Sequence, residues 1–267
     1  MDNRPIGVFD SGLGGLTAIK ELRKVLPNEK LFYFGDTGRV PYGTRSADAI
    51  AKYTKQDMAF LLSQNVKMIV AACATVSSNA KEILQTSPVP FATIIEPSAD
   101  AASNATKNGK IGVIATSATI NSKAFEIALS AKNHEVFSTA CPLLVPLVEN
   151  GFIEQDEQIT RLALEHYLKP LIEKGIDTLI LGCTHYPILQ NIIKSILGDN
   201  VTLINSGKEI ATDCAKKLNA LNLLADNSTK ESEFFVSDSV QNFNDIAKIC
   251  LGSAITEKIT KIDIDKY

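Results

Sequence analysis

Residues 65–73 (NVKMIVAAC) decide the fold, because an outline of this stretch returns at residues 175–183 (GIDTLILGC). A second stretch, residues 6–9 (IGVF), returns at residues 111–114 (IGVI), at nearly the same offset and in the same order. Buried parallel strands are rich in Val, Ile and Leu whatever their origin, and this alone can produce such a likeness. We favour a duplicated unit, because both copies of the longer stretch end in cysteine. Two similar units then place equivalent strand ends, and their cysteines, across a shared cleft.

Outward from these stretches, short apolar segments alternate with segments of helical period along the whole chain. Strands that alternate with helices form mostly parallel sheets, so we predict an α/β fold. Ser46 is the predicted N-cap of a helix whose apolar residues between Ile50 and Leu61 recur at roughly helical spacing. The predicted strands are residues 6–10, 31–35, 67–72, 89–95, 110–115, 135–140, 178–182, 201–205 and 233–237. The other predicted helices are residues 16–26, 78–85, 122–131, 157–174, 188–197, 208–224 and 242–251.

Composition limits the classes of function. The chain has 267 residues, of which 45% are hydrophobic and 21% charged, so it can bury a sizeable core. Its 27 Lys and Arg are outnumbered by 30 Asp and Glu, and the net charge of −3 argues against binding nucleic acid through phosphates. No apolar stretch reaches the roughly 18 residues of a membrane-spanning helix, and the first residues lack the pattern of a secretory signal. We therefore expect a cytoplasmic protein that binds neither nucleic acid nor membrane.

The five cysteines, Cys73, Cys141, Cys183, Cys214 and Cys250, are scattered and form no CxxC pair. An odd, scattered set does not indicate a disulfide framework, and in a reducing cytosol these thiols are expected to be free. Cys141, Cys214 and Cys250 have no polar motif around them, so we predict that they pack in the core.

Four segments present polar residues where predicted strands end: residues 10–12 (DSG), 36–37 (DT), 73–75 (CAT) and 183–185 (CTH). Ligands of open α/β sheets bind outside the carboxyl ends of the strands, so these segments are the candidate site. Helix N-termini at such a site suit a ligand that carries a carboxylate, and they lower the pKa of a nearby cysteine. None of the segments contains a lysine, which disfavours pyridoxal phosphate as a cofactor.

Two other kinds of site are weaker fits. Residues 12–15 (GLGG) follow a strand and Asp36 lies downstream, as in a dinucleotide site, but the third fingerprint position is Thr17 rather than Gly or Ala. Cys183 and His185 could begin a zinc site, yet neither a CxxC nor an HxxxH is present to complete it.

The other two histidines have structural interpretations. His166 follows Leu162 by four residues on an apolar helix face and is predicted to be a core histidine. His134 lies in a polar stretch and is predicted to be a solvated loop residue.

The motifs carry a resemblance. Residues 10–12 (DSG), 35–43 (GDTGRVPYG), 72–75 (ACAT) and 181–187 (LGCTHYP) resemble, in order and spacing, the motif series of the cofactor-independent glutamate racemases. The similarity runs through almost the whole chain, as far as residues 234–252. The second and fourth motifs are long and specific.

The resemblance implies a fold and a setting. It implies two similar α/β domains with the active site in the cleft between them, the first made of residues 1–97 and 207–267 and the second of residues 98–206. It implies catalysis with no cofactor and no metal, a homodimer, and a supply of D-glutamate to peptidoglycan. The substrate is a small molecule, glutamate.

The resemblance also implies two opposed cysteines, since a proton leaves one face of Cα and another arrives at the opposite face. Cys73 is implied for one enantiomer and Cys183 for the other, with Asp10 assisting Cys73 and His185 assisting Cys183. Glu149 matches an acidic position near the cleft. The implied substrate-binding residues are Asp10, Ser11, Tyr42, Gly43, Ala74, Thr75, Thr184 and His185, with Pro41 as a further candidate.

Ala74 departs from the family pattern, which usually has Asn after the first cysteine. Alanine cannot offer a side-chain amide, so position 74 is at most a backbone contact, and affinity is affected more than chemistry. We expect that another polar group, from Ser77 or from the loop of residues 39–43, takes the place of the amide.

Three other functions remain open at this point. An aspartate racemase shares the two cysteines but tends to carry Glu rather than His at the position of His185. A non-catalytic carboxylate-binding protein could have lost activity through Ala74. A nucleotide-dependent oxidoreductase would need a bound nicotinamide.

Overall fold

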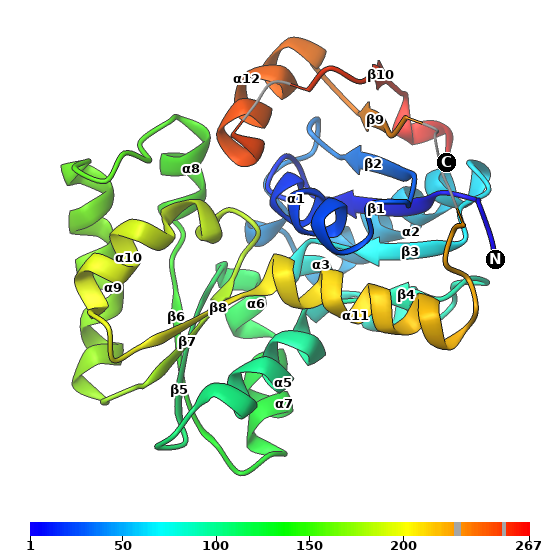
Figure 1. Cartoon of the computed structure of the whole chain (residues 1–267). Helices are drawn as coiled ribbons and strands as arrows, with labels where there is room; N and C mark the ends of the chain where they lie inside the picture. The colour runs from blue at the N-terminus through cyan, green and yellow to red at the C-terminus, as the bar shows by residue number, and fades with distance from the viewer. Residues whose placement is uncertain (227–230, 253–254) are drawn as a thin grey trace.

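The computed structural model describes residues 1–226, 231–252 and 255–267, which form two parallel β-sheets flanked by helices (Figure 1). The first sheet has the strand order β10-β9-β2-β1-β3-β4 and the second has the order β6-β5-β7-β8. The strands of the first sheet are β1 (Ile6–Asp10), β2 (Leu31–Gly35), β3 (Met68–Ala71), β4 (Phe91–Ala92), β9 (Glu233–Val236) and β10 (Ile259–Lys261). Those of the second are β5 (Lys110–Ala115), β6 (Glu135–Ala140), β7 (Thr178–Gly182) and β8 (Thr202–Asn205). The predicted α/β fold with mostly parallel sheets is confirmed.

The repeat seen in the sequence is also present in the topology. The order β2-β1-β3-β4 in the first sheet corresponds to β6-β5-β7-β8 in the second. Ile6 pairs with Met68 in the first sheet, and its counterpart Ile111 pairs with Thr178 in the second. β3 and β7 thus occupy equivalent places, and counted from the first residue of each strand, Met68 or Thr178, the cysteine lies at the same spacing.

The helices follow the strands in the manner of crossover connections. Ser46 caps α2, as predicted, by accepting a hydrogen bond from the backbone N–H of Ala49 at 3.3 Å. The α-helices are α1 (Leu16–Val25), α2 (Ala47–Ser63), α3 (Ala74–Asn79), α4 (Lys81–Leu84), α5 (Ile95–Ala105), α6 (Ser117–Asn121), α7 (Ala124–Ser130), α8 (Leu144–Glu149), α9 (Gln158–Glu173), α10 (Gln190–Leu197), α11 (Ser206–Ala220) and α12 (Val240–Leu251). The described residues also form the 3₁₀ turns η1 (Tyr42–Thr44), η2 (Tyr186–Leu189) and η3 (Ile264–Lys266).

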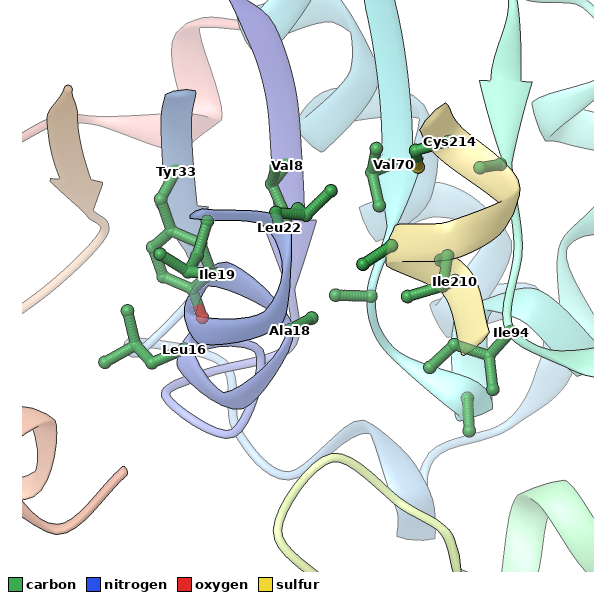
Figure 2. Close-up of a cluster of buried hydrophobic side chains, with 14 of the residues drawn as sticks. Val8, Leu16, Ala18, Ile19, Leu22, Tyr33, Val70, Ile94, Ile210 and Cys214 are labelled. Atoms are coloured by element: carbon green, nitrogen blue, oxygen red, sulfur yellow. The ribbon is translucent and has the colours of Figure 1, made fainter. Parts of the chain in front are cut away.

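The core of the first sheet lies under α1 and α11, which pack side by side on one face of it (Figure 2). Val8 and Val70 from the strands meet Ile19 of α1 and Ile210 and Cys214 of α11, and all five are fully buried. Burial of such side chains contributes roughly 1.5–3 kcal/mol each, so this layer anchors the strand ends from which the site is built. Cys214 is a packing residue here, as predicted.

Several predicted elements differ in extent. The region of the helix predicted at residues 78–85 holds two helices, α3, which begins directly after Cys73, and α4. The strand predicted at 89–95 is only Phe91–Ala92. Ile94 is instead the N-cap of α5 and Ile95 its first residue, because that helix buries a face of small residues including Ala99 and Ala102. α5, α6, α8 and β10 were not among the predicted elements. Within the described ranges, the helices are all too short or too polar to cross a membrane.

Candidate active site

A cavity of about 280 Å³ lies where the loops after β1, β3, β5 and β7 meet α8 and η1. Its wall therefore comes from both sheets, at the carboxyl ends of their strands. The predicted site residues that line the cavity are Ser11, Pro41, Tyr42, Gly43, Cys73, Ala74, Thr75, Glu149, Cys183, Thr184 and His185.

Cys73 is the N-cap of α3 and is 5% exposed. Its Sγ lies 3.6 Å from Ser11 Oγ. Burial, and after it the nearby carboxyl group of Asp10, raises the pKa of the Cys73 thiol to about 12, whereas the Val76 N–H and the Ser11 hydroxyl oppose this effect. Cys73 is therefore a protonated thiol at neutral pH.

Cys183 follows β7 and lies beside a buried histidine. Its Sγ is 3.8 Å from Nδ1 of His185, whose Nε2 is 3.1 Å from Oε1 of Glu149 at the end of α8. Burial lowers the pKa of His185, but its hydrogen bonds with Cys183 and Glu149, and the charges of these two groups, raise that pKa to about 10. His185 is therefore placed to exchange a proton with the Cys183 sulfur.

Asp10 does not line the cavity. It is fully buried behind the loop after β1, where Oδ2 accepts a hydrogen bond from the Gly12 N–H at 3.0 Å and Oδ1 lies 3.4 Å from Thr184 Oγ1. Burial raises the pKa of Asp10, and the positive charge of His185 opposes this effect. Asp10 thus contacts the segment that carries Cys183, whereas the neighbouring Ser11 contacts Cys73.

The sequence and the fold of this chain are similar to those of known amino-acid racemases. A family model described as Asp/Glu/Hydantoin racemase matches residues 17–214. A glutamate racemase of Chlorobaculum tepidum is 43% identical over 258 residues, which cover 95% of this chain and 94% of that protein. The glutamate racemase of Thermoanaerobacter pseudethanolicus is 44% identical over 271 residues, covering all of both chains. The crystal structure of glutamate racemase from Francisella tularensis in complex with D-glutamate superposes with a TM-score of 0.93, at 39% identity and full coverage of both chains.

The chain belongs to the Asp/Glu/Hydantoin racemase family. The relatives span its full length, so the match covers both sheets and the cavity between them. As a member of this family, the chain is an isomerase and an amino-acid racemase. This identification argues against a nucleotide-dependent oxidoreductase and against a non-catalytic carboxylate-binding protein.

The glycine turn of this family member has a packing role. A Cβ atom at Gly14 would lie 2.2 Å from Thr184 Oγ1 and 2.5 Å from Nδ1 of His185. Thr17 Oγ1 also donates to the Thr184 carbonyl at 2.8 Å. The segment after β7 therefore fills the space above the turn, so the turn does not fit a dinucleotide pyrophosphate. Nor do the described residues contain three metal-ligating side chains close enough together to hold an ion.

Tyr42 lines the cavity, but its hydroxyl group points to two carboxyl groups outside the cavity. The hydroxyl bonds to Oδ2 of Asp36 and lies 3.1 Å from Oδ2 of Asp57, and Tyr42 is fully buried. Only the remaining atoms of the Tyr42–Thr44 turn are available to a ligand.

The polar groups expected to replace the amide missing at Ala74 are also engaged. Ser77 Oγ donates to the Ala71 carbonyl at 3.1 Å and accepts from the Ile94 N–H at 3.2 Å. The Arg39 guanidinium is bound to carboxyl groups, as described below. Ser77 thus joins α3 to the end of β3 and to the start of α5, and it does not compensate for Ala74.

Thr116 and Cys141 line the cavity, and the motif analysis missed both. Thr116 Oγ1, the N-cap of α6, lies 3.0 Å from Thr75 Oγ1 and so links segments of the two sheets. The offset that relates Ile6 to Ile111 also relates Ser11 to Thr116 and the position after β2 to Cys141. The internal repeat was therefore the signal that could have found both residues.

Cys141 packs in the core as predicted but also lines the cavity, and the burial of two histidines differs from prediction. Cys141 is fully buried but forms part of the cavity wall, where burial and then Cys183 raise its pKa. His166 is exposed, because the core-facing residues of α9 are Leu164 and Leu168 rather than the face that holds Leu162. His134 is half-buried, with Nε2 2.7 Å from a serine hydroxyl.

Proposed function

We propose that this chain is a glutamate racemase that interconverts L- and D-glutamate with two cysteines and no cofactor. The observation that carries the proposal is the pair of cysteines from equivalent places in two similar sheets, both lining one cavity. Removing the Cα proton from one face and returning a proton to the other needs acid–base groups on both faces. Two opposed thiols meet that need in the simplest way.

The two cysteines act together as one thiolate and one thiol, and their surroundings differ. Burial and Asp10 disfavour charge on Cys73, whereas the His185 ring lies 3.8 Å from the Cys183 sulfur. For one enantiomer, the Cys183 thiolate takes the Cα proton and the Cys73 thiol donates one to the opposite face. For the other enantiomer, the Cys73 thiolate takes the proton and the Cys183 thiol donates one. Glu149 orients His185 through the 3.1 Å contact and holds its charge.

The polar groups of the cavity wall fit an amino acid's charged ends. Ser11, Thr75 and Thr184 offer hydroxyls, and Gly43 offers backbone. Asp10 acts from behind, by holding the Gly12 and Thr184 segments in place, and Pro41, Tyr42 and Ala74 contribute wall atoms.

Glutamate rather than aspartate is the proposed substrate, since the two relatives above carry the name glutamate racemase and the Francisella protein was crystallised with D-glutamate. Circular dichroism of L-glutamate and L-aspartate, each incubated with the purified protein without added cofactor, tests this choice. We expect the signal of L-glutamate to decay to zero and that of L-aspartate to persist. Decay of the aspartate signal alone would reverse the assignment.

The setting of the enzyme is part of the proposal. We place the division of domains at residues 1–97 with 207–267 and at 98–206; of these, residues 227–230 and 253–254 lie outside the described structure. α5 crosses the first junction and packs on α11 at the second. The five free cysteines suit a reducing cytoplasm, where D-glutamate would feed peptidoglycan synthesis. A homodimer is expected, and analytical ultracentrifugation tests it.

A further inference from the structure

The hydroxyl group of Tyr42 lies between two fully buried carboxyl groups. It bonds to Oδ2 of Asp36 and also lies 3.1 Å from Oδ2 of Asp57 in α2. A tyrosine hydroxyl has one hydrogen and donates only once, whereas an ionised carboxylate can only accept. Both contacts are hydrogen bonds only if one of the two carboxyl groups carries a proton and donates it.

The partners of the two carboxyl groups differ. Asp36 accepts from Arg39 Nε at 2.6 Å, from Ser237 Oγ at 2.7 Å and from Tyr42. Asp57 has one longer contact besides Tyr42, from Arg39 Nη2 at 3.2 Å. Hydrogen bonds to a carboxylate stabilise its charged form, so Asp36 is the ionised member and Asp57 the neutral acid.

The surrounding charges agree with this assignment. Arg39 is shared between the two carboxyl groups and also donates to Gln56 at 2.5 Å while covering the ring of Tyr53. Burial raises the pKa of Asp57 well above its usual value, the charges of Asp36 and Asp10 add to this effect, and Arg39 and the Tyr42 hydroxyl oppose it. At η3, which packs on α2, the N-cap Asp263 and Lys266 are exposed and pair with each other.

This cluster supports one wall of the cavity. Tyr42–Thr44 is the turn that lines the cavity opposite the second sheet, and a Cβ atom at its Gly43 would lie 2.7 Å from Thr116 Cβ. A small displacement of the turn therefore changes the contact between the two sheets at the cavity. We propose that Asp57 is a positioning residue, a neutral carboxylic acid that donates to Tyr42 and fixes this turn for substrate binding. The effect on substrate binding rests on the proposed racemase function, whereas the protonation of Asp57 does not.

Two variants at one position separate charge from hydrogen bonding. Asp57→Asn keeps a neutral donor for Tyr42, so we expect KM for both enantiomers to stay within about threefold of the wild type. Asp57→Ala removes the donor, and we expect KM to rise roughly 5- to 30-fold while kcat changes about threefold or less. Lys55→Ala, at an exposed position of α2, is the matched control. An Asn variant as impaired as the Ala variant, or an Ala variant with normal KM, overturns the proposal.

A spectroscopic measurement tests the proton itself without relying on activity. The infrared difference spectrum of wild type minus Asp57→Asn at neutral pH should contain the C=O stretching band of a protonated carboxyl group. Absence of that band overturns the assignment of Asp57, even where Asp57→Ala does not fold. A wild-type protein that shows the band but does not racemise glutamate would instead refute the proposed function alone.

Discussion

Nε2 of His185 lies 3.1 Å from Oε1 of Glu149, a contact between the segment after β7 and the end of α8. The contact fixes the ring so that Nδ1 faces the Cys183 sulfur. The histidine therefore connects a reactive thiol to a carboxylate that is partly open to solvent.

The raised pKa of His185 predicts a dependence of stability on pH. An unfolded histidine titrates near pH 6.5, whereas the folded value is about 10, so between these values only the native state holds the proton. This contribution to the free energy of unfolding is full below about pH 6.5 and is lost as the pH rises through about 10. Urea unfolding of the wild type and of His185→Asn at several pH values checks it. If the free energy of unfolding changed equally with pH in the two proteins between about pH 6.5 and 10, the prediction would be contradicted.

Activity should need both cysteines of the cavity. Cys73→Ala or Cys183→Ala leaves one face of Cα without a proton carrier, and we expect kcat to fall by at least about 10²–10⁴-fold. Cys214→Ala is the matched control, since Cys214 lies in the core away from the cavity. We also expect Cys141→Ala to remain active. It is a less suitable control than Cys214→Ala, because Cys141 lines the cavity. Near-normal turnover by either active-site variant would exclude the two-base mechanism.

Product made in deuterated water should carry deuterium at Cα. The proton that returns to substrate comes from the opposite thiol, which exchanges with solvent, and not from the proton just removed. Mass spectrometry of D-glutamate formed early from L-glutamate measures this incorporation. Product that keeps its original Cα hydrogen would indicate a single base.

Restoring an amide at position 74 should tighten binding. A hydrogen bond to a charged group contributes about 1.5–3 kcal/mol, or roughly 10–150-fold in affinity, and Ser77 does not supply it. We therefore expect Ala74→Asn to lower KM for glutamate about tenfold or more, with kcat little changed, in steady-state kinetics in both directions. An unchanged or higher KM would mean that the loop of residues 39–43 already fills the place.

A methyl group on Gly14 should disturb the chemistry from outside the cavity. Its Cβ would fall 2.2 Å from Thr184 Oγ1, forcing the Thr184–His185 segment to move. Displacements near 1 Å in a catalytic constellation cost about 10²-fold in rate, and we expect kcat of Gly14→Ala to fall by that order. Gly38→Ala is the control, because its nearest neighbour would be Ser237 Oγ at 3.2 Å. Equal kcat for the two variants would refute the packing role of Gly14.

The strands were predictable because buried parallel strands leave a strong apolar signal, as at Ile6–Asp10 and Thr178–Gly182. α5 was not, because Ile94 and Ile95 extend the apolar run of the preceding strand and only tertiary packing assigns them to a helix. The motifs marked the cysteine segments, since polar residues directly after apolar runs are conspicuous.

Asp57 left no comparable signal. A carboxylate inside an amphipathic helix is ordinarily an exposed residue, and nothing local indicates that Arg39 and Tyr42 cover it. Thr116 could have been predicted from the sequence, because the internal repeat relates it to Ser11. The features that were not predicted therefore depend mostly on contacts between segments that are far apart in the sequence.

The two cysteines occupy equivalent places, but their surroundings are unlike, with Asp10 near one and the His185–Glu149 pair beside the other. Enantiomers have equal free energies in water, so the overall equilibrium constant is one, and kcat/KM must be identical in the two directions. The unequal surroundings therefore cannot make the enzyme favour either product. They can only give one enantiomer a higher KM together with a kcat that is higher by the same factor.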